Sequence, residues 1–163
     1  MYLYKKRVLN EQNYKKEIIK HVLLFYMLCL YQITAIRIGL GLSIESITSR
    51  DYRVNFVPIA ALWRWVLKGR WWLLTYHVIG NCIWFVPLGV LVPALFHKQR
   101  KLWRITLLGA GISLSIEILQ FIICTGVTDI DDVIFNTLGT VIGYCIWKLC
   151  DSIRGSLEMH KTI

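Results

Sequence analysis

Four stretches of the chain are almost entirely apolar, and shorter polar segments separate them. The apolar stretches cover residues 18–40, 75–96, 105–124 and 131–149. Each has roughly the 20 residues that a helix needs to cross a hydrocarbon core about 30 Å thick. The pattern therefore predicts four transmembrane helices. The first is longer than the apolar core of a signal peptide, which has about 7–15 residues, so we expect it to stay in the mature protein.

The segment at residues 59–74, IAALWRWVLKGRWWLL, interleaves tryptophan with basic residues. Arg64, Lys68 and Arg70 would each cost about 2.5–3.5 kcal/mol at the centre of a spanning helix, whereas tryptophan prefers the membrane interface. The segment is therefore predicted to be an amphipathic helix that lies in the membrane surface, with a break at Gly69.

Prolines mark irregular backbone on either side of this segment. The sequence Asn55-Phe-Val-Pro58 predicts a turn or an extended segment, because the residue before a proline avoids the helical region. Pro87, Gly89 and Pro93 predict a kinked second helix, which a membrane tolerates where neighbouring groups satisfy the freed carbonyls.

The composition agrees with a membrane protein. Of the 163 residues, 56% are hydrophobic and 18% are charged, and the mean hydropathy is +0.52. Soluble domains average about 45–50% apolar and about 25% charged residues. The length has room for one domain. The predicted fold class is therefore an all-α integral membrane domain over residues 1–163, with four spans and one surface helix.

Lysine and arginine are unevenly distributed between the predicted loops. Thirteen lie in the N-terminal tail, the 97–104 loop and the C-terminal tail or at the adjoining ends of the apolar stretches, whereas the 41–74 loop has five and the 125–132 loop has none. Because cytoplasmic loops carry the excess of positive charge, both termini are predicted in the cytoplasm. Topology and attraction to anionic lipids thus explain the net charge of +9, and no nucleic-acid partner is expected.

The five cysteines lie in or at the ends of the apolar stretches and form neither a CxxC pair nor a His/Cys ligand spacing. We expect them to act as small apolar residues, with no disulfide framework and no metal site. The sequence also lacks a P-loop and an HExxH motif, so no cofactor is expected.

Several polar side chains fall within the apolar stretches, where they are costly and usually have a function. In the predicted topology the third helix runs outward and the second and fourth run inward, so their polar residues reach one depth in the outer half of the bilayer. These residues are Asn81, Glu117, Gln120 and Asn136, with Arg37 near the outer end of the first helix. They predict an outward-facing polar pocket.

Glu117 has three interpretations. It binds a ligand, it performs acid–base chemistry, or it is paired within the bundle with Arg37, His77 or Asn136. Even the structural interpretation requires a partner or a proton, because an isolated charge in lipid costs several kcal/mol.

The residues that follow also have more than one explanation. Thr128 with Asp131, or Asp129 with Asp132, has the spacing of a helix cap. Asp129 and Asp132 also lie at the predicted mouth of the pocket. An alternative is that they hold a divalent cation together with Glu117. Gly139 and Gly143 have the small-xxx-small spacing that lets another helix approach closely, either from the same chain or from a second copy in a homo-oligomer.

These residues also carry a resemblance. The motifs are Asn55-x-x-Pro58, Asn81-x-x-x-Phe85-x-Pro87-x-Gly89, Glu117-Ile-Leu-Gln120, Gly126-x-Thr128-Asp129-Ile130-x-Asp132 and Asn136-Thr-Leu-Gly139 with Gly143. In their order and spacing they resemble the VanZ family of bacterial membrane proteins. Departures are Ile59 and Leu88 after the two prolines, and an acidic Asp131. The resemblance implies a multi-pass protein of the bacterial cell membrane and low-level resistance to teicoplanin-type glycopeptide antibiotics.

Two functions follow from the sequence. The first is a non-enzymatic protein whose pocket binds an amphiphile, such as a lipid-linked cell-wall precursor, a phospholipid headgroup or a lipoglycopeptide. The second is a membrane enzyme for a lipid-linked envelope substrate, with Glu117 and Asp132 as acid–base groups or metal ligands. The predicted ligand-binding residues are Asn55, Asn81, Glu117, Gln120, Asp129, Asp132 and Asn136, and the predicted structural residues are Arg37, Pro58, Pro87, Gly89, Gly139 and Gly143.

Overall fold

A computed structural model describes residues 2–36, 54–123, 125 and 128–160. The long helices are α1 (Tyr2–Tyr31), which continues into the π-helix η1 (Gln32–Ile36), α4 (Trp71–Leu95), α5 (Leu102–Ile123) and α6 (Ile130–His160). The short elements are β1 (Val54–Asn55), α3 (Ala60–Leu67), the 3₁₀-helix η2 (His97–Gln99) and β2 (Thr128–Asp129). Arg37 lies outside the described residues.

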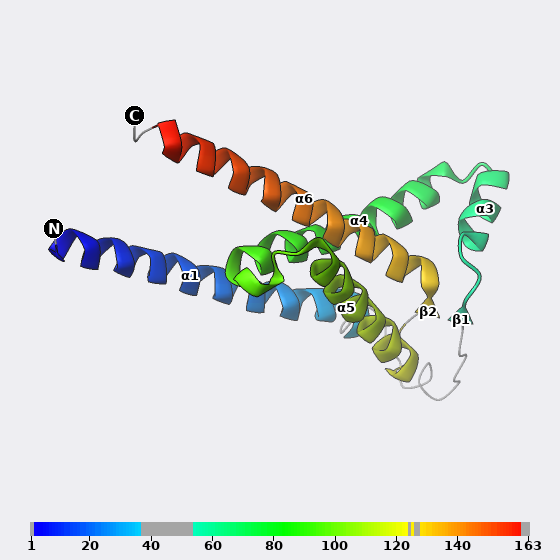
Figure 1. Cartoon of the computed structure of the whole chain (residues 1–163). Helices are drawn as coiled ribbons and strands as arrows, with labels where there is room; N and C mark the ends of the chain where they lie inside the picture. Colours follow the sequence, from blue (N-terminus) through cyan, green and yellow to red (C-terminus); the bar gives the residue numbers. More distant parts are fainter. Residues whose placement is uncertain (1, 37–53, 124, 126–127, 161–163) are drawn as a thin grey trace.

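The four predicted transmembrane helices are confirmed. The described chain has four helices that are long and apolar enough to cross a membrane, at Asn13–Ala35, Trp71–Leu95, Leu102–Ile123 and Ile130–Leu157. The N- and C-terminal parts of α1 and α6 project from one end of the bundle, here called the terminal end (Figure 1). The elements β1, β2 and α3 lie at the opposite end, here called the β end. That the terminal end faces the cytoplasm stays a prediction.

The surface helix is shorter than predicted. Helix α3 ends at Leu67, and the chain reverses at Gly69, whose φ of 64° lies in the left-handed region that glycine adopts without strain. The break at Gly69 is therefore present, but residues 71–74 belong to the spanning helix α4 and not to the surface helix. On α3, Leu62 is buried whereas Trp63 and Leu67 are exposed.

Three further features differ from the prediction. Helix α1 already begins at Tyr2, within the basic tail, and α6 continues to His160, eleven residues beyond the predicted end of the fourth span at Leu149. Strands β1 and β2 form a two-stranded parallel sheet that the apolar pattern did not predict. Two-residue strands are too short to leave a period-two signal in a sequence.

Helices α4 and α6 form the most extensive helix pair, and glycines make their close approach possible. A Cβ atom on Gly139 would overlap the carbonyl oxygen of Cys82, and one on Gly143 would overlap that of Val86. A Cβ atom on Gly89 would lie 2.9 Å from the Cα atom of Gly143. The small-xxx-small spacing therefore serves a contact within the chain, which is one of the two uses that the sequence left open.

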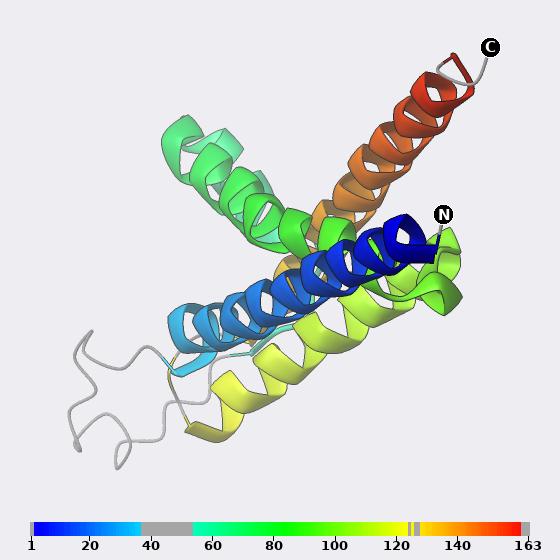
Figure 2. The same ribbon diagram turned by 90° about the vertical axis from the view of Figure 1, so that its left-hand side faces the viewer.

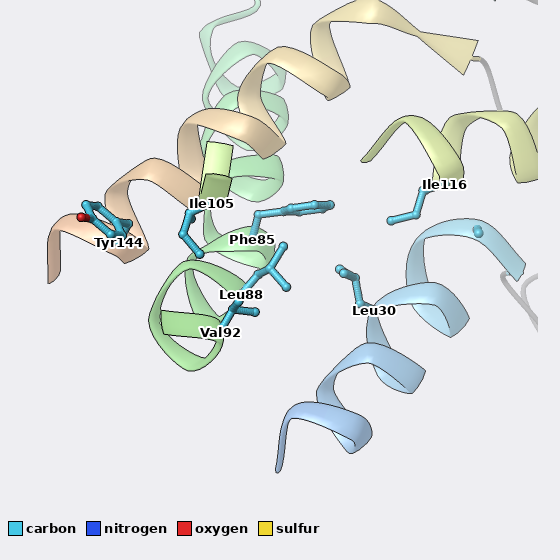
Figure 3. Close-up of a cluster of buried hydrophobic side chains, with 8 residues drawn as sticks. Leu30, Phe85, Leu88, Val92, Ile105, Ile116 and Tyr144 are labelled. Atoms are coloured by element: carbon cyan, nitrogen blue, oxygen red, sulfur yellow. The ribbon is translucent and has the colours of Figure 1, made fainter. Parts of the chain in front are cut away.

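A cluster of buried apolar side chains joins the other helices. Leu30 of α1 and Ile116 of α5 point toward each other, and Phe85 and Leu88 of α4 lie beside them (Figure 3). In the view of Figure 2, α1 and α5 run in the same direction below α4 and α6. Two backbone carbonyls of α4 near its prolines accept hydrogen bonds from side chains, although the carbonyls that Pro87 and Pro93 free are those of Ile83 and Gly89. The Tyr26 hydroxyl donates to the Trp84 carbonyl at 2.7 Å, and the Arg100 Nε–H to the Pro93 carbonyl at 3.1 Å.

Candidate functional site

Most of the predicted site residues meet at the β end, where β1 and β2 bring two distant segments together. Val54 pairs with Thr128 and Asn55 with Asp129. The Asn55 side-chain amide donates to Oδ2 of Asp129 at 3.0 Å, while Oδ1 of Asp129 accepts the backbone N–H of Asp131 at 2.9 Å. Asp129 thus fixes the segment before α3 and satisfies a free N–H group at the start of α6.

Asp131 holds the turn that leads into α3. Pro58 and Ile59 occupy the central positions of this turn, and Ile59 has a φ of 64°, which is strained for a β-branched residue. The Ile59 N–H lies 2.8 and 3.1 Å from the two carboxylate oxygens of Asp131, whose side chain is buried. Asp131 was noted in the sequence as a departure from the family pattern but was not placed in the site, although an acidic residue in an apolar helix was a visible signal.

Glu117 is buried inside the bundle, with 3% of its surface exposed. Its Oε2 atom accepts the backbone N–H of Asp129 at 2.9 Å, and its own backbone carbonyl accepts the Thr128 hydroxyl at 3.4 Å. Among the described residues, Asn136 donates to Ser113 at 2.8 Å and His77 contacts Asp132. Glu117 therefore connects the middle of α5 to strand β2.

Gln120 and Thr125 fasten the C-terminal end of α5 and the segment just after it to the π-helix η1. The Gln120 amide donates to the carbonyl of Thr34 at 2.7 Å, and the Thr125 hydroxyl donates to that of Ala35 at 2.6 Å. Carbonyls in the last turn of a helix lack backbone N–H donors within that helix. The two side-chain donors supply hydrogen bonds to such carbonyls and so stabilise the end of η1. Oε1 of Gln120 is buried without a hydrogen bond among the described residues.

The accessible part of the site centres on Asp132. Its Oδ1 atom accepts the Asn81 side-chain amide at 2.6 Å and lies 3.1 Å from Nε2 of His77. The latter distance is that of an ion pair, although the ring is not aligned for a hydrogen bond. The Asp132 and His77 side chains are 21% and 22% exposed. Both are far more accessible than Glu117, Gln120 or Asn136.

Aromatic rings enclose the imidazole of His77. Trp65 of α3 stands edge-on to it with centroids 5.3 Å apart, and Phe135 of α6 does so at 6.3 Å. Helix α3 therefore contributes a wall to the site, and its role as an interfacial anchor stays a prediction. The sequence interpretation treated His77 only as a packing or pairing residue and did not place Trp65 in the site.

The site thus divides into a buried network and an accessible pair. Glu117, Asp129 and Asp131 each accept a backbone N–H group, and Asn136 is buried against Ser113 of α5. Asp132 and His77 are partly open. Within the described residues, no group of three or more His, Cys, Asp or Glu side chains is arranged to hold a metal ion.

Fold and site together define a multi-pass helical membrane protein with a polar site at one end of its bundle. The VanZ/LLP1 family model matches residues 23–151 of the chain. The chain belongs to this family, which confirms the resemblance. It is 34% identical over 87 residues to Protein VanZ of Enterococcus faecium, and the match covers 53% of each chain.

The chain therefore matches about half the length of this curated relative. No solved structure matches the chain.

Proposed function

We propose that this protein contributes to low-level resistance against teicoplanin-type glycopeptides from the bacterial cell membrane. It does so by binding an amphiphile at an outward-facing polar site at the β end. The ligand is a lipid-linked wall precursor, a phospholipid headgroup or a lipoglycopeptide. Family membership supports the association with glycopeptide resistance.

The observation that carries the binding role is the pair formed by Asp132 and His77. Both side chains are about one-fifth exposed although they belong to spanning helices. A partly exposed carboxylate accepts hydrogen bonds from the hydroxyl, amide and amine groups of a ligand, and a partly exposed imidazole can both accept and donate them. The tryptophan-bearing helix α3 lies beside them and supplies an apolar surface for the lipid part of an amphiphile.

The test is teicoplanin susceptibility in a sensitive host that expresses Asp132→Asn, His77→Gln or Glu117→Gln, with membrane level measured in parallel. If Asp132 and His77 contact the ligand, their variants lose resistance at unchanged membrane level. The matched control is Asp151→Asn, which neutralises an exposed carboxylate of α6 near the terminal end. Full resistance in both the Asp132 and the His77 variant would contradict the proposed site.

One observation favours an enzyme as the second candidate function. A carboxylate beside an imidazole is an arrangement that orients a general base. In that case His77 would take a proton from a lipid-linked substrate, and Asp132 would stabilise the imidazolium. Glu117 is less suited to this role, because it is buried and accepts a backbone N–H. The test is to incubate the purified protein with a lipid-linked precursor and to measure the mass of the recovered precursor. A changed mass that disappears in His77→Gln supports an enzyme, and an unchanged mass supports binding alone.

A further inference from the structure

A groove at the terminal end is separate from the polar site. It has a volume of about 590 Å³ and lies between α1, α4 and α5. Its floor includes Leu88, Val92 and Leu95 of α4, which are buried, and Leu23 of α1 forms part of its wall. Leu88 and Val92 project from the side of α4 that faces α1 (Figure 3). The volume falls within the range of about 300–1,000 Å³ typical of sites for small ligands.

The groove exists because α1 approaches α5 mainly through its last residues. Tyr31 and Ser115 share a hydrogen bond of 2.5 Å, and Gln120 reaches the carbonyl of Thr34. Toward the terminal end, the space beside α1 is open and apolar, with Leu108 and Ile112 of α5 as its far wall.

Positive charge gathers at one end of the groove. Lys16 of α1 and Lys98 of η2 belong to its lining. Lys15 lines a smaller hollow of about 220 Å³, which shares Lys16, Leu95 and His97 with the groove. The lining includes no aspartate or glutamate among the described residues. Basic side chains at the membrane surface attract anionic headgroups.

The length of the groove also fits one lipid leaflet. It extends along α1 from Lys16 to Met27, and the eleven residue steps between them span about 16.5 Å at 1.5 Å per step. Half of a hydrocarbon core about 30 Å thick is about 15 Å. The lysines therefore lie at headgroup level when the apolar part of the groove lies beside the acyl chains.

From these observations we infer that the groove is a binding site for one anionic phospholipid. The phosphate lies between Lys16 and Lys98, and one acyl chain lies along Leu23 and Leu95. The proposal depends neither on the polar site at the β end nor on which side of the membrane the terminal end faces.

The test is native mass spectrometry of the delipidated full chain, titrated with dioleoyl phosphatidylglycerol or dioleoyl phosphatidylcholine. We expect one phosphatidylglycerol per chain to bind in preference to phosphatidylcholine. The double variant Lys16→Gln/Lys98→Gln should bind phosphatidylglycerol about 30-fold more weakly, because each lysine near an anionic surface contributes a factor of about five. The matched control, Lys101→Gln/Lys148→Gln, removes the same charge from exposed positions outside the groove and should bind normally.

A second pair of variants tests the acyl-chain part. Leu23→Trp fills the groove and should reduce phosphatidylglycerol binding at least about fivefold. Leu24→Trp places the same side chain on the adjacent lipid-facing position, which is 60% exposed, and should have no effect. Equal binding of the two lipids, or equal binding by the groove variants and their controls, would overturn the proposal. A dimer that forms without lipid and dissociates in Leu23→Trp would show instead that a second copy occupies the groove.

Discussion

The carboxylate of Glu117 accepts the backbone N–H of Asp129 at 2.9 Å, and this contact connects α5 to the strand that precedes α6. Asp129 in turn binds Asn55 and the N–H of Asp131, and Asp131 binds the N–H of Ile59. One buried carboxylate therefore begins a chain of contacts that reaches the start of α3. The geometry of the β end, including the wall that Trp65 provides beside His77, depends on this chain.

Removing the Glu117 carboxylate should destabilise the β end. In Glu117→Ala the Asp129 N–H loses its side-chain acceptor, and an unsatisfied buried donor costs about 1–3 kcal/mol. Glu117→Gln keeps an oxygen at the same position and is expected to lose less. The measurement is the apparent Tm of the purified protein in detergent. The matched control is Ile118→Ala, the neighbouring lipid-facing residue, which is 50% exposed. Equal Tm values for Glu117→Ala and Ile118→Ala would contradict the structural role.

The glycine contact between α4 and α6 gives a second prediction. Gly143→Ala forces a methyl group against the backbone at Val86 and should cost about 1–3 kcal/mol, as overpacking does in other cores. Gly111→Ala on α5 meets nothing within 4 Å and should keep its Tm or raise it slightly, because alanine favours helices. Thermal unfolding and size-exclusion chromatography would be measured together. A change in oligomeric state at unchanged Tm in Gly143→Ala would assign these glycines to a dimer contact instead.

The sequence predicted the spanning helices well because their length and apolar content are set by the bilayer itself. It also identified Asn81 and Glu117 as polar residues that need partners among apolar neighbours, and they bind Asp132 and Asp129. Pro58 was correctly expected to mark a turn, because proline restricts the backbone before it. These predictions needed only local composition and spacing.

The specific pairings could not be predicted. Asp132 binds Asn81 and Asp131 binds Ile59, and which of the two adjacent carboxylates faces which neighbour depends on the rotation of α6 against α4. Partners 51 and 72 residues apart leave no trace in a single sequence. The start of α4 at Trp71 was not predicted either. Tryptophans favour the membrane interface both in a surface helix and at the start of a spanning helix, so Trp71 and Trp72 do not distinguish the two.

Ile59 offers a variant that should stabilise the protein. Its φ of 64° is unfavourable for a β-branched residue, and its side chain is 58% exposed, so the side chain contributes little packing. Ile59→Gly removes the strain, which costs on the order of 1–3 kcal/mol, and keeps the N–H that Asp131 accepts. We expect a higher apparent Tm. Val57→Gly is the control, because it introduces glycine at an exposed neighbour whose φ is not positive, and it should not raise the Tm.

The contact between Asn81 and Asp132 can separate a structural role from a binding role. Hydrogen bonds between membrane helices contribute about 0.6 kcal/mol on average and up to about 1.7 kcal/mol. A double-mutant cycle of Asn81→Ala and Asp132→Ala should therefore give a coupling energy in the stability of the protein near the upper end of this range, since the acceptor is a carboxylate at 2.6 Å. If Asp132 also binds a ligand, the losses of teicoplanin resistance in the three variants do not follow their losses of stability. In that case Asp132→Ala alone abolishes resistance, whereas Asn81→Ala, which leaves the carboxylate in place, reduces it only in part. Parallel losses of stability and resistance in all three variants would show that Asp132 serves the packing of α4 against α6 and nothing more.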